Sequence, residues 1–481
     1  MMLKLLISMP LLGIIMGKVL GSKGENQRKI GLLYSIITMY ISLYILLTTN
    51  NNNIEYQYRE TIEISGIRIV LGLDGISESL ILVTTILIPI LILIKERKEE
   101  EEQEKIVNYL LLMESMLIML FASLDIFIFF LMFELLLIPM YLIIGRYGSP
   151  EGSKRIEAGY RFIIYSLIGS LIMLISIIII YIKYGSTNNE ILMVQLSKEN
   201  FYIIKILWLS LFFSFAIKVP IFPFHTWLPF VHVEAPTIGS MLLAGIMLKL
   251  GGYGLIRYTL NFLGDEKDFF IPIIIIMTLL SIIYGSLTTI RQIDFKKFIA
   301  YSSIVHMNFA ILGLFSSEAE GLQGGCFLMI SHAFVSSALF FLIGLLYKRY
   351  HTRIIFYFYG IVSVMPIFAS FFFFFSLANV SFPFTSSFIS EIFILISSFK
   401  FNPLVGFFLA FSLILSTTFG LWFPNRFLFG QISPNMQVFL DLTLYEVLTL
   451  LPLTFFTLLL GVFPQPLLSF YTLSVSTLCI I

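Results

Sequence analysis

Apolar runs of roughly 18 to 25 residues recur along the whole sequence, and they constrain the fold more than any other feature. Each run is long enough to cross the hydrocarbon core of a bilayer, which is about 30 Å thick, at about 1.5 Å per helical residue. The chain is 58% hydrophobic and only 12% charged, whereas soluble domains have about 25% charged residues. The sequence therefore predicts an all-α polytopic membrane protein.

Length and hydropathy predict about fourteen transmembrane helices. Their expected first residues lie near positions 3, 30, 76, 107, 125, 160, 203, 235, 269, 297, 321, 356, 403 and 444. Basic residues support this number, because Lys and Arg gather on the inner side of a membrane. Of the 30 basic residues, 19 fall in odd-numbered connections and nine in the others, while Lys218 and Lys249 fall inside spans. This distribution places both termini on the outer side.

Three segments differ from the apolar runs in composition. Residues 54–70 alternate apolar and polar side chains and contain Gly66, which predicts a small β-hairpin on the outer surface. The acidic run EEEEQE at residues 99–104 lies in a loop rich in Lys and Arg and is predicted to be a solvated face. Lys4 precedes an apolar core, but a basic segment follows in place of a small-residue cleavage site. That core is therefore predicted to be the first spanning helix rather than a signal peptide.

Overall charge and cysteine content exclude several function classes. The net charge of +1 gives no reason to expect a nucleic-acid partner. Cys326 and Cys479 both lie in apolar sequence, so they are expected to form neither a disulfide framework nor a metal site. The sequence also has no Gly-rich nucleotide-binding loop.

Ionisable residues inside the expected spans are the strongest functional signal. Such a group costs about 2.5–3.5 kcal/mol at the bilayer centre, which makes it a candidate functional residue. Two acids, two lysines and two histidines occur at similar depth on different helices. They are Glu134, Lys218, Lys249, His306, His332 and Glu391. Each histidine alone could equally be a structural residue bonded to a backbone carbonyl, so the set is more informative than its members.

The chemistry of this set indicates proton transfer. Its spacing matches neither a metal site nor a Ser-His-Asp triad. Burial raises the pKa of a carboxylic acid and lowers that of a lysine, and a nearby opposite charge does the reverse. Protonation of an acidic neighbour, for which Glu134 is the candidate, could therefore switch Lys218 between ammonium and amine. The set is predicted to be a proton relay, with His225 and His232 as accessory candidates that are equally consistent with structural roles.

Prolines interrupt the chain beside two of these charges. Pro220 and Pro223 remove backbone donors and are predicted to end the seventh helix just after Lys218. In hydrocarbon, the freed carbonyls need protein or a water-filled cavity, so the break predicts internal water. The tripeptide FPF stands at 222–224 and again at 382–384, and each copy is predicted to break a spanning helix. Interrupted spans at corresponding positions predict two inverted repeats of five helices each, helices 4 to 8 and helices 9 to 13.

The chain is accordingly expected to have four parts. The first holds three helices and the hairpin, the next two hold the inverted repeats, and the last holds the fourteenth helix. Their expected bounds are residues 1–106, 107–262, 266–426 and 427–481.

Two adjacent motifs carry a resemblance to a known family. KVPIFPFHTWLPFVHVEAP, followed by LKLGGYG, resembles the proton-translocating, antiporter-like membrane subunits of respiratory complex I. LGLDGIS and RQIDFKKFIAYSSIVHM match two further blocks of that family, and the likeness extends from about residue 70 to about residue 425. Chain length, motif wording and the acid Glu391 favour the mitochondrial subunit of intermediate length. The family's alanine or serine before the second histidine is Val231 here, and the histidine itself is in place.

The resemblance implies a role for each buried charge. Glu134 and Lys218 would form the ion pair of one half-channel, and Lys249 would be the central relay. The hydrophilic axis would then continue along the chain's other buried groups to an exit-side carboxylate. These are His306, His332 and Glu391, in that order.

The resemblance also implies the surroundings of the chain. NADH, flavin mononucleotide, iron–sulfur clusters and ubiquinone would bind to other subunits, with no cofactor and no redox chemistry in this chain. Adjacent antiporter-like chains, accessory subunits and phospholipids such as cardiolipin would be its partners, in the mitochondrial inner membrane or, alternatively, a bacterial plasma membrane.

Two other functions stay open from sequence. An Mrp-type Na⁺/H⁺ antiporter subunit predicts ion exchange without NADH or quinone. A structural spacer with a vestigial relay predicts tolerance of Lys218→Met and Lys249→Met.

Overall fold

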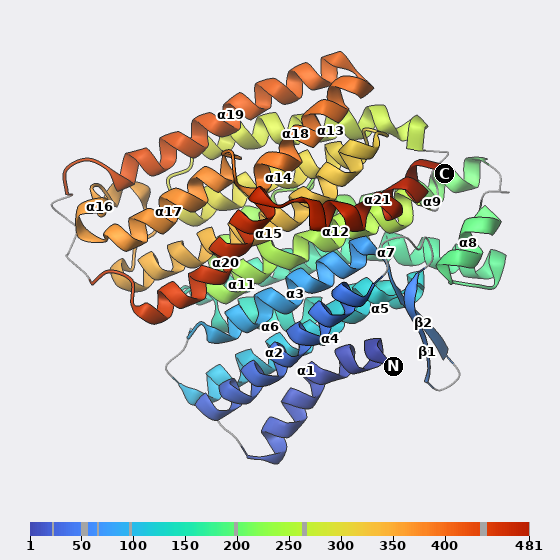
Figure 1. The fold of residues 1–481 in the computed structure, drawn as a ribbon, viewed down its shortest axis with the longest axis horizontal. Helices are drawn as coiled ribbons and strands as arrows, with labels where there is room; N and C mark the ends of the chain where they lie inside the picture. The colour runs from blue at the N-terminus through green and yellow to red at the C-terminus, as the bar shows by residue number, and fades with distance from the viewer. Residues whose placement is uncertain are drawn as a thin grey trace.

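The structure, a computed structural model, describes residues 1–21, 24–49, 56–64, 67–95, 99–196, 201–261, 267–432 and 440–480. Within these residues, twelve helices are long and apolar enough to cross a membrane. The helices run side by side in one bundle, with both chain termini and the hairpin toward the same end (Figure 1). The chain is therefore a mostly helical, multi-pass membrane protein with a small two-stranded sheet.

The elements follow one another along the chain in three parts. The first part forms α1 (Met2–Val19), α2 (Glu25–Thr48), β1 (Gln57–Ile64), β2 (Ile67–Leu73), α3 (Gly75–Leu93), α4 (Glu100–Ala122), α5 (Ile126–Leu135), α6 (Leu137–Tyr147), α7 (Gly152–Tyr184) and α8 (Asn189–Leu196). The middle part forms α9 (Phe201–Lys218), α10 (Trp227–Glu234), α11 (Thr237–Leu242), the π-helix η1 (Leu243–Met247), α12 (Leu248–Gly254), the π-helix η2 (Leu255–Leu260), α13 (Lys267–Ile290), α14 (Phe295–Leu314) and α15 (Ala319–Tyr350). The last part forms the 3₁₀-helix η4 (Ile355–Tyr357), α16 (Ile361–Val364), α17 (Pro366–Asn379), α18 (Ser386–Phe401), α19 (Pro403–Leu428), α20 (Leu444–Val462) and α21 (Gln465–Ile480).

Most helices begin within a few residues of the expected positions, with instructive exceptions. The acidic run is wrongly predicted to be a loop, because α4 begins at Glu100 and its first turn carries Glu100, Glu101 and Glu102. Carboxylates are favourable there because the exposed N–H groups give a helix N-terminus a partial positive charge. The C-terminal helix α21 was not expected. The seventh and twelfth expected spans are absent from the twelve long helices, because each is divided in two.

The hairpin prediction is confirmed for the described residues. β1 pairs with β2 in antiparallel register, with Ile62 opposite Ile69. The predicted turn residue Gly66 and the first two residues of the predicted segment lie outside the described residues. Asp74 directly follows β2 and forms a capping box with Ser77, so the end of the sheet starts α3.

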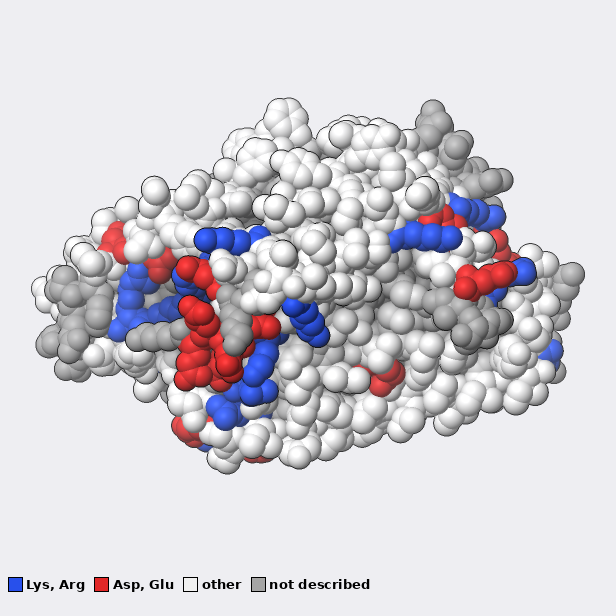
Figure 2. Space-filling view, turned by 90° about the horizontal axis from the view of Figure 1, so that it is seen from below, with Lys and Arg blue, Asp and Glu red and all other residues white. Residues whose placement is uncertain are grey.

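Charged residues are distributed over the surface of the bundle as expected for a membrane protein. In the view of Figure 2, Lys, Arg, Asp and Glu gather toward two opposite ends, and the band between them is almost uncharged. Two spans, Thr237–Leu260 and α15, each contain an 18-residue stretch that is fully buried inside the chain. Most of the expected relay residues lie on or beside these two central helices.

Candidate functional site

The seventh span ends where the prolines predict. α9 stops at Lys218, and the chain resumes a helix only at Trp227. The indole Nε1–H of Trp227 donates to Ile217 O at 3.0 Å. The amide of Asn308 donates to Pro220 O at 3.3 Å.

Protein groups therefore donate to two of the carbonyl groups beside this break. A third bond, from the Phe222 N–H to Ser281 Oγ at 2.7 Å, completes the same pattern. The sequence predicted internal water from this break, and that stays a prediction, because a buried carbonyl accepts an indole or amide donor as well as water.

Lys218 lies at the end of α9 in an aromatic environment. Its side chain is buried, and Nζ has no hydrogen-bond partner among the described residues. Nζ lies 4.7 Å from the ring centre of Phe133 and 5.2 Å from that of Phe162, within cation–π range. Glu134 interacts with Lys218 electrostatically and has Ser170 beside it. The two charges make no direct ion pair among the described contacts, so the expected pair is a longer-range one in this structure.

Lys249 lies between two π-helical segments of the same span. Its side chain is 1% exposed. Nζ donates to Ala244 O at 2.5 Å and lies 2.9 Å from His332 Nδ1. π-Helical turns are rare and occur frequently at functional sites. The structure thus joins two of the predicted residues, from η1–α12 and from α15, by a direct contact.

The chain of titratable groups continues from His332. The rings of His332 and His306 are 5.9 Å apart between centres. His306 Nδ1 lies 3.3 Å from Glu391 Oε1, without the geometry of a hydrogen bond. Four of the six predicted residues therefore lie in one row across α12, α15, α14 and α18.

The two accessory histidines differ in their surroundings. The ring of His232 stacks on Phe340 at 4.6 Å, and neither of its nitrogens has a described partner. His232 interacts electrostatically with Lys249 and Lys296. His225 instead contacts aromatic side chains near the break, so only His232 is brought close to the row.

Lys296 is a buried cation that sequence reasoning assigned to a loop. It is 5% exposed, and Nζ donates to Ala235 O at 2.7 Å. The hydropathy pattern started the span near residue 297 and so left Lys296 in the preceding loop. In the structure α14 begins at Phe295, so Lys296 lies in its first turn and is buried, while Lys297 is exposed. Lys296 also lines a cavity of about 920 Å³ whose wall includes Arg28, Lys95, Lys348 and Arg353.

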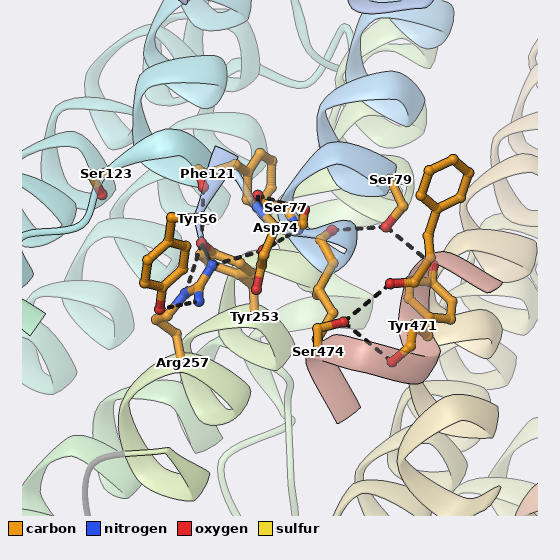
Figure 3. Close-up of polar contacts among 12 residues, drawn as sticks. Tyr56, Asp74, Ser77, Ser79, Phe121, Ser123, Tyr253, Arg257, Tyr471 and Ser474 are labelled. Carbon is orange, nitrogen blue, oxygen red and sulfur yellow. Dashed lines mark hydrogen bonds and ion pairs between the residues drawn. The ribbon is translucent and has the colours of Figure 1, made fainter. Parts of the chain in front are cut away.

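A second buried cation was also assigned to a loop. Arg257, in η2, forms an ion pair with Asp74 at 2.9 Å and contacts the hydroxyl groups of Tyr56 and Tyr253, as Figure 3 shows. Tyr253 in turn donates to Phe121 O at 2.8 Å. These contacts join the hairpin end of the bundle to the span that carries Lys249. Asp74 belongs to the LGLDGIS block, but the sequence offered no signal for its partner.

Comparisons with known proteins agree with this architecture. The family described as NADH:quinone oxidoreductase/Mrp antiporter, TM, matches residues 123–417. NADH-ubiquinone oxidoreductase chain 4 of Marchantia polymorpha is 44% identical, over 98% of this chain and 96% of the relative. The same subunit of Chondrus crispus is 42% identical, over 95% and 93% of the two chains.

Solved structures show the same fold. A chain of respiratory complex I from Thermus thermophilus, with bound NADH, superposes with a TM-score of 0.87 at 27% identity, covering 98% of this chain and 99% of that one. A chain of the Mrp complex from Dietzia shares the fold with a TM-score of 0.83 at 18% identity, over 98% of this chain and 51% of that one. The resemblance predicted from the sequence is confirmed. The chain belongs to the NADH:quinone oxidoreductase/Mrp antiporter family, as a proton-translocating membrane-arm subunit of NADH:ubiquinone oxidoreductase.

Proposed function

We propose that the row of buried titratable groups is the path by which this subunit moves protons. Its residues are Glu134, Lys218, Lys249, His332, His306 and Glu391. The observation that carries the proposal is the 2.9 Å contact between Lys249 Nζ and His332 Nδ1. A lysine and a histidine at that distance, both enclosed by protein, can share one proton but cannot both hold a charge at low cost.

The transfer steps follow from this geometry. A protonated Lys249 gives a proton to Nδ1 of neutral His332 and becomes a neutral amine. His332 passes a proton from its other nitrogen toward His306, across a 5.9 Å separation of ring centres that one water molecule can bridge. His306 passes it to Glu391, whose carboxylate lies 3.3 Å away. Each step moves one proton and leaves one neutral and one protonated group.

The supply of protons to Lys249 is proposed to come from two directions. Lys218 and Glu134 lie on one side of Lys249. A change in the protonation of Glu134 there alters the electrostatic environment of Lys218. His232 lies on the other side, between Lys249 and Lys296, and Lys296 lines the cavity of about 920 Å³. His225 is retained as an accessory candidate near the break.

The paired breaks support a repeat architecture. α17 ends at Asn379 and α18 begins at Ser386, so the second FPF segment interrupts its span as the first does. Counting each interrupted span as one crossing adds two to the twelve long helices, which is the proposed total of fourteen. The proposed parts are residues 1–106, 107–262, 266–426 and 427–481, although the first bound falls inside α4.

The chain's surroundings are proposed from its family. Its partners include other complex I subunits, and adjacent antiporter-like chains, accessory subunits and phospholipids such as cardiolipin are proposed contacts. The proposed location is the mitochondrial inner membrane. NADH, flavin, iron–sulfur clusters and ubiquinone are proposed to bind elsewhere in the complex.

The test replaces the titratable imidazole ring at the centre of the row. His332→Asn should leave complex assembly intact and abolish most proton pumping coupled to NADH oxidation, because Asn does not titrate. His351→Asn is the matched control, since His351 is exposed at the end of the same helix and its positive φ of 54° suits Asn. Pumping by assembled His332→Asn complex at the wild-type rate would refute the relay. Pumping that depends on sodium would favour the antiporter alternative.

A further inference from the structure

Helix α2 has hydroxyl side chains along its buried face and large apolar side chains on its exposed face. Its buried residues include Ser35, Thr38 and Ser42. Its exposed residues include Leu33 and Leu47. Hydroxyl groups on the buried face of a membrane helix mark contacts with other polar groups rather than with lipid. This face packs against α3 and α4, so a polar seam runs between the three helices, away from the relay.

The seam contains a carboxyl group that the relay does not use. Glu114, on α4, is 0% exposed. Its Oε1 lies 2.6 Å from Thr38 Oγ1, and its Oε2 has no described hydrogen-bond partner. Glu114 lies eight residues, about 12 Å, from the end of α4 that joins the hairpin. It is therefore an acid held deep in the membrane with one polar contact.

Among the described contacts, none joins this acid to a positive charge. The basic residues on the described helices packed against α4 include Lys4 and Lys18 on α1 and Arg28 and Lys29 on α2, and none of the described ion pairs or hydrogen bonds joins them to Glu114. The acids on these neighbouring helices are Glu25 on α2, Glu78 on α3 and Glu134 on α5. Their negative charges would disfavour ionisation of Glu114. An isolated buried carboxylate is strongly disfavoured relative to the neutral acid.

The hydroxyl of Thr38 points to the same protonation state. Its Oγ1 lies 2.7 Å from Ser35 O and 2.6 Å from Glu114 Oε1. The hydroxyl has one proton, so it cannot donate to both oxygens. If Glu114 is ionised, one of these short oxygen–oxygen contacts has no proton in it. If Glu114 is protonated, its O–H donates to Thr38, and Thr38 donates to Ser35 O.

We propose that Glu114 is a second proton-binding site, separate from the relay, that holds a proton at rest and exchanges it with the outer face through the seam. The outer part of the seam continues one helical turn beyond Thr38, where Ser42 Oγ lies 2.8 Å from Thr85 Oγ1. Two further turns along lie Thr49, the C-cap residue of α2, and Glu78, on α3, which interact with each other. Hydroxyl and carboxyl groups at these intervals can order water between them.

The inner part of the seam is closed by apolar packing. A Cβ atom added to Gly31 would lie 2.6 Å from Val107 Cγ1, so α2 and α4 are in close contact there. Leu111, also on α4, is 0% exposed beside it. Gln27 and Asn108 do form a hydrogen bond of 2.7 Å nearer the inner cavity, but on α4 the buried Leu111 lies between Asn108 and Glu114. The described contacts therefore give the proton on Glu114 an outward route and no inward one.

The experiment compares infrared spectra of the assembled wild-type complex and its Glu114→Gln variant. Gln keeps the shape and neutrality of the protonated acid, so assembly should be retained. The difference spectrum should contain the carbonyl band of a protonated carboxyl, and the band should shift after transfer to D₂O. Ser42→Ala combined with Thr85→Val should slow that shift roughly tenfold, the rate equivalent of one lost hydrogen bond. Ser35→Ala, on the inner side of Thr38, is the matched control and should leave the rate unchanged.

A second measurement covers the case in which the Gln variant does not assemble. A hydrophobic carbodiimide adds to a protonated carboxyl to give a stable N-acylurea, with no leaving group, and does not react in this way with a carboxylate. Wild-type complex should carry the adduct on the peptide that contains Glu114. Absence of both the band and the adduct would overturn the proposal. A band that never shifts in D₂O would also overturn it, because the proton would then be locked in place.

Discussion

Replacing each buried lysine by methionine should separate the cost of folding from the cost of function. Methionine matches the length of lysine and fills the same space without a charge or a donor. Lys218 Nζ has no described hydrogen-bond partner. Lys218→Met therefore leaves no acceptor unsatisfied, and replacement of a buried charge by an apolar group is often neutral or stabilising by about 1–4 kcal/mol.

Lys249→Met, in contrast, is expected to destabilise the protein. It removes the donor to Ala244 O and the partner of His332 Nδ1. Each buried acceptor left alone costs about 1–3 kcal/mol, so the two together cost about 2–6 kcal/mol before the gain from burying a methionine side chain, about 1.5–3 kcal/mol, is subtracted. The expected net destabilisation is up to about 4.5 kcal/mol, and none is expected for Lys218→Met.

The assay measures thermal stability and assembly of the complex alongside proton pumping. Both variants should lose most NADH-driven pumping, because each removes a proton-binding group from the row. Only Lys249→Met should lower the unfolding temperature or the yield of assembled complex. Equal destabilisation by the two substitutions would refute the hydrogen-bond assignment. Normal pumping by both assembled variants would instead support the structural-spacer alternative.

Two further substitutions test the contacts that surround the row. Lys296→Met should slow pumping several-fold without loss of assembly if the inner cavity supplies protons, whereas Lys297→Met, at the exposed neighbouring position, should not; pumping assays on assembled complex distinguish them. Trp227→Phe removes the indole donor to the carbonyl just before the break, so it should destabilise the complex by about 1–3 kcal/mol. Thermal unfolding measures this, and Trp422→Phe, at a position that is 39% exposed, should have no comparable effect.

Much of this fold was accessible from sequence because membrane spans are long and local. The periods that predict spans and the hairpin depend on neighbouring residues alone, and the structure confirms both. The end of α9 at Lys218 was also predictable, because a proline acts on the backbone of its own segment. The acidic run failed for the same local reason. The five glutamates of this run lower the local hydropathy and so indicate a loop, whereas a helix N-terminus favours acidic side chains in its first turn.

The contacts of the site were less predictable because they join segments far apart in the chain. Depth in the membrane grouped Lys249 with His332, but nothing in either segment indicates a 2.9 Å contact. The family resemblance implied an ion pair between Glu134 and Lys218, and in the structure Lys218 lies against aromatic rings and interacts with Glu134 at longer range. Lys296 was missed because a charge near a span end is read as solvated unless its inward direction is known.

The two lysines of the proposed relay both lie beside irregular backbone, and this would affect how Lys249 holds a proton. In a regular helix, the interior carbonyl groups are engaged in hydrogen bonds four residues apart, which leaves a buried ammonium with few acceptors. At the end of η1, the N–H of Leu248 bonds to Leu243 O, five residues back, so it does not occupy Ala244 O, the carbonyl that binds Lys249 Nζ. A backbone dipole rather than a carboxylate therefore stabilises the charge on Lys249. The proton affinity of that lysine depends on the π turn being in place, so a shift of this one turn toward α-helix would weaken the hold on the proton and favour its transfer to His332.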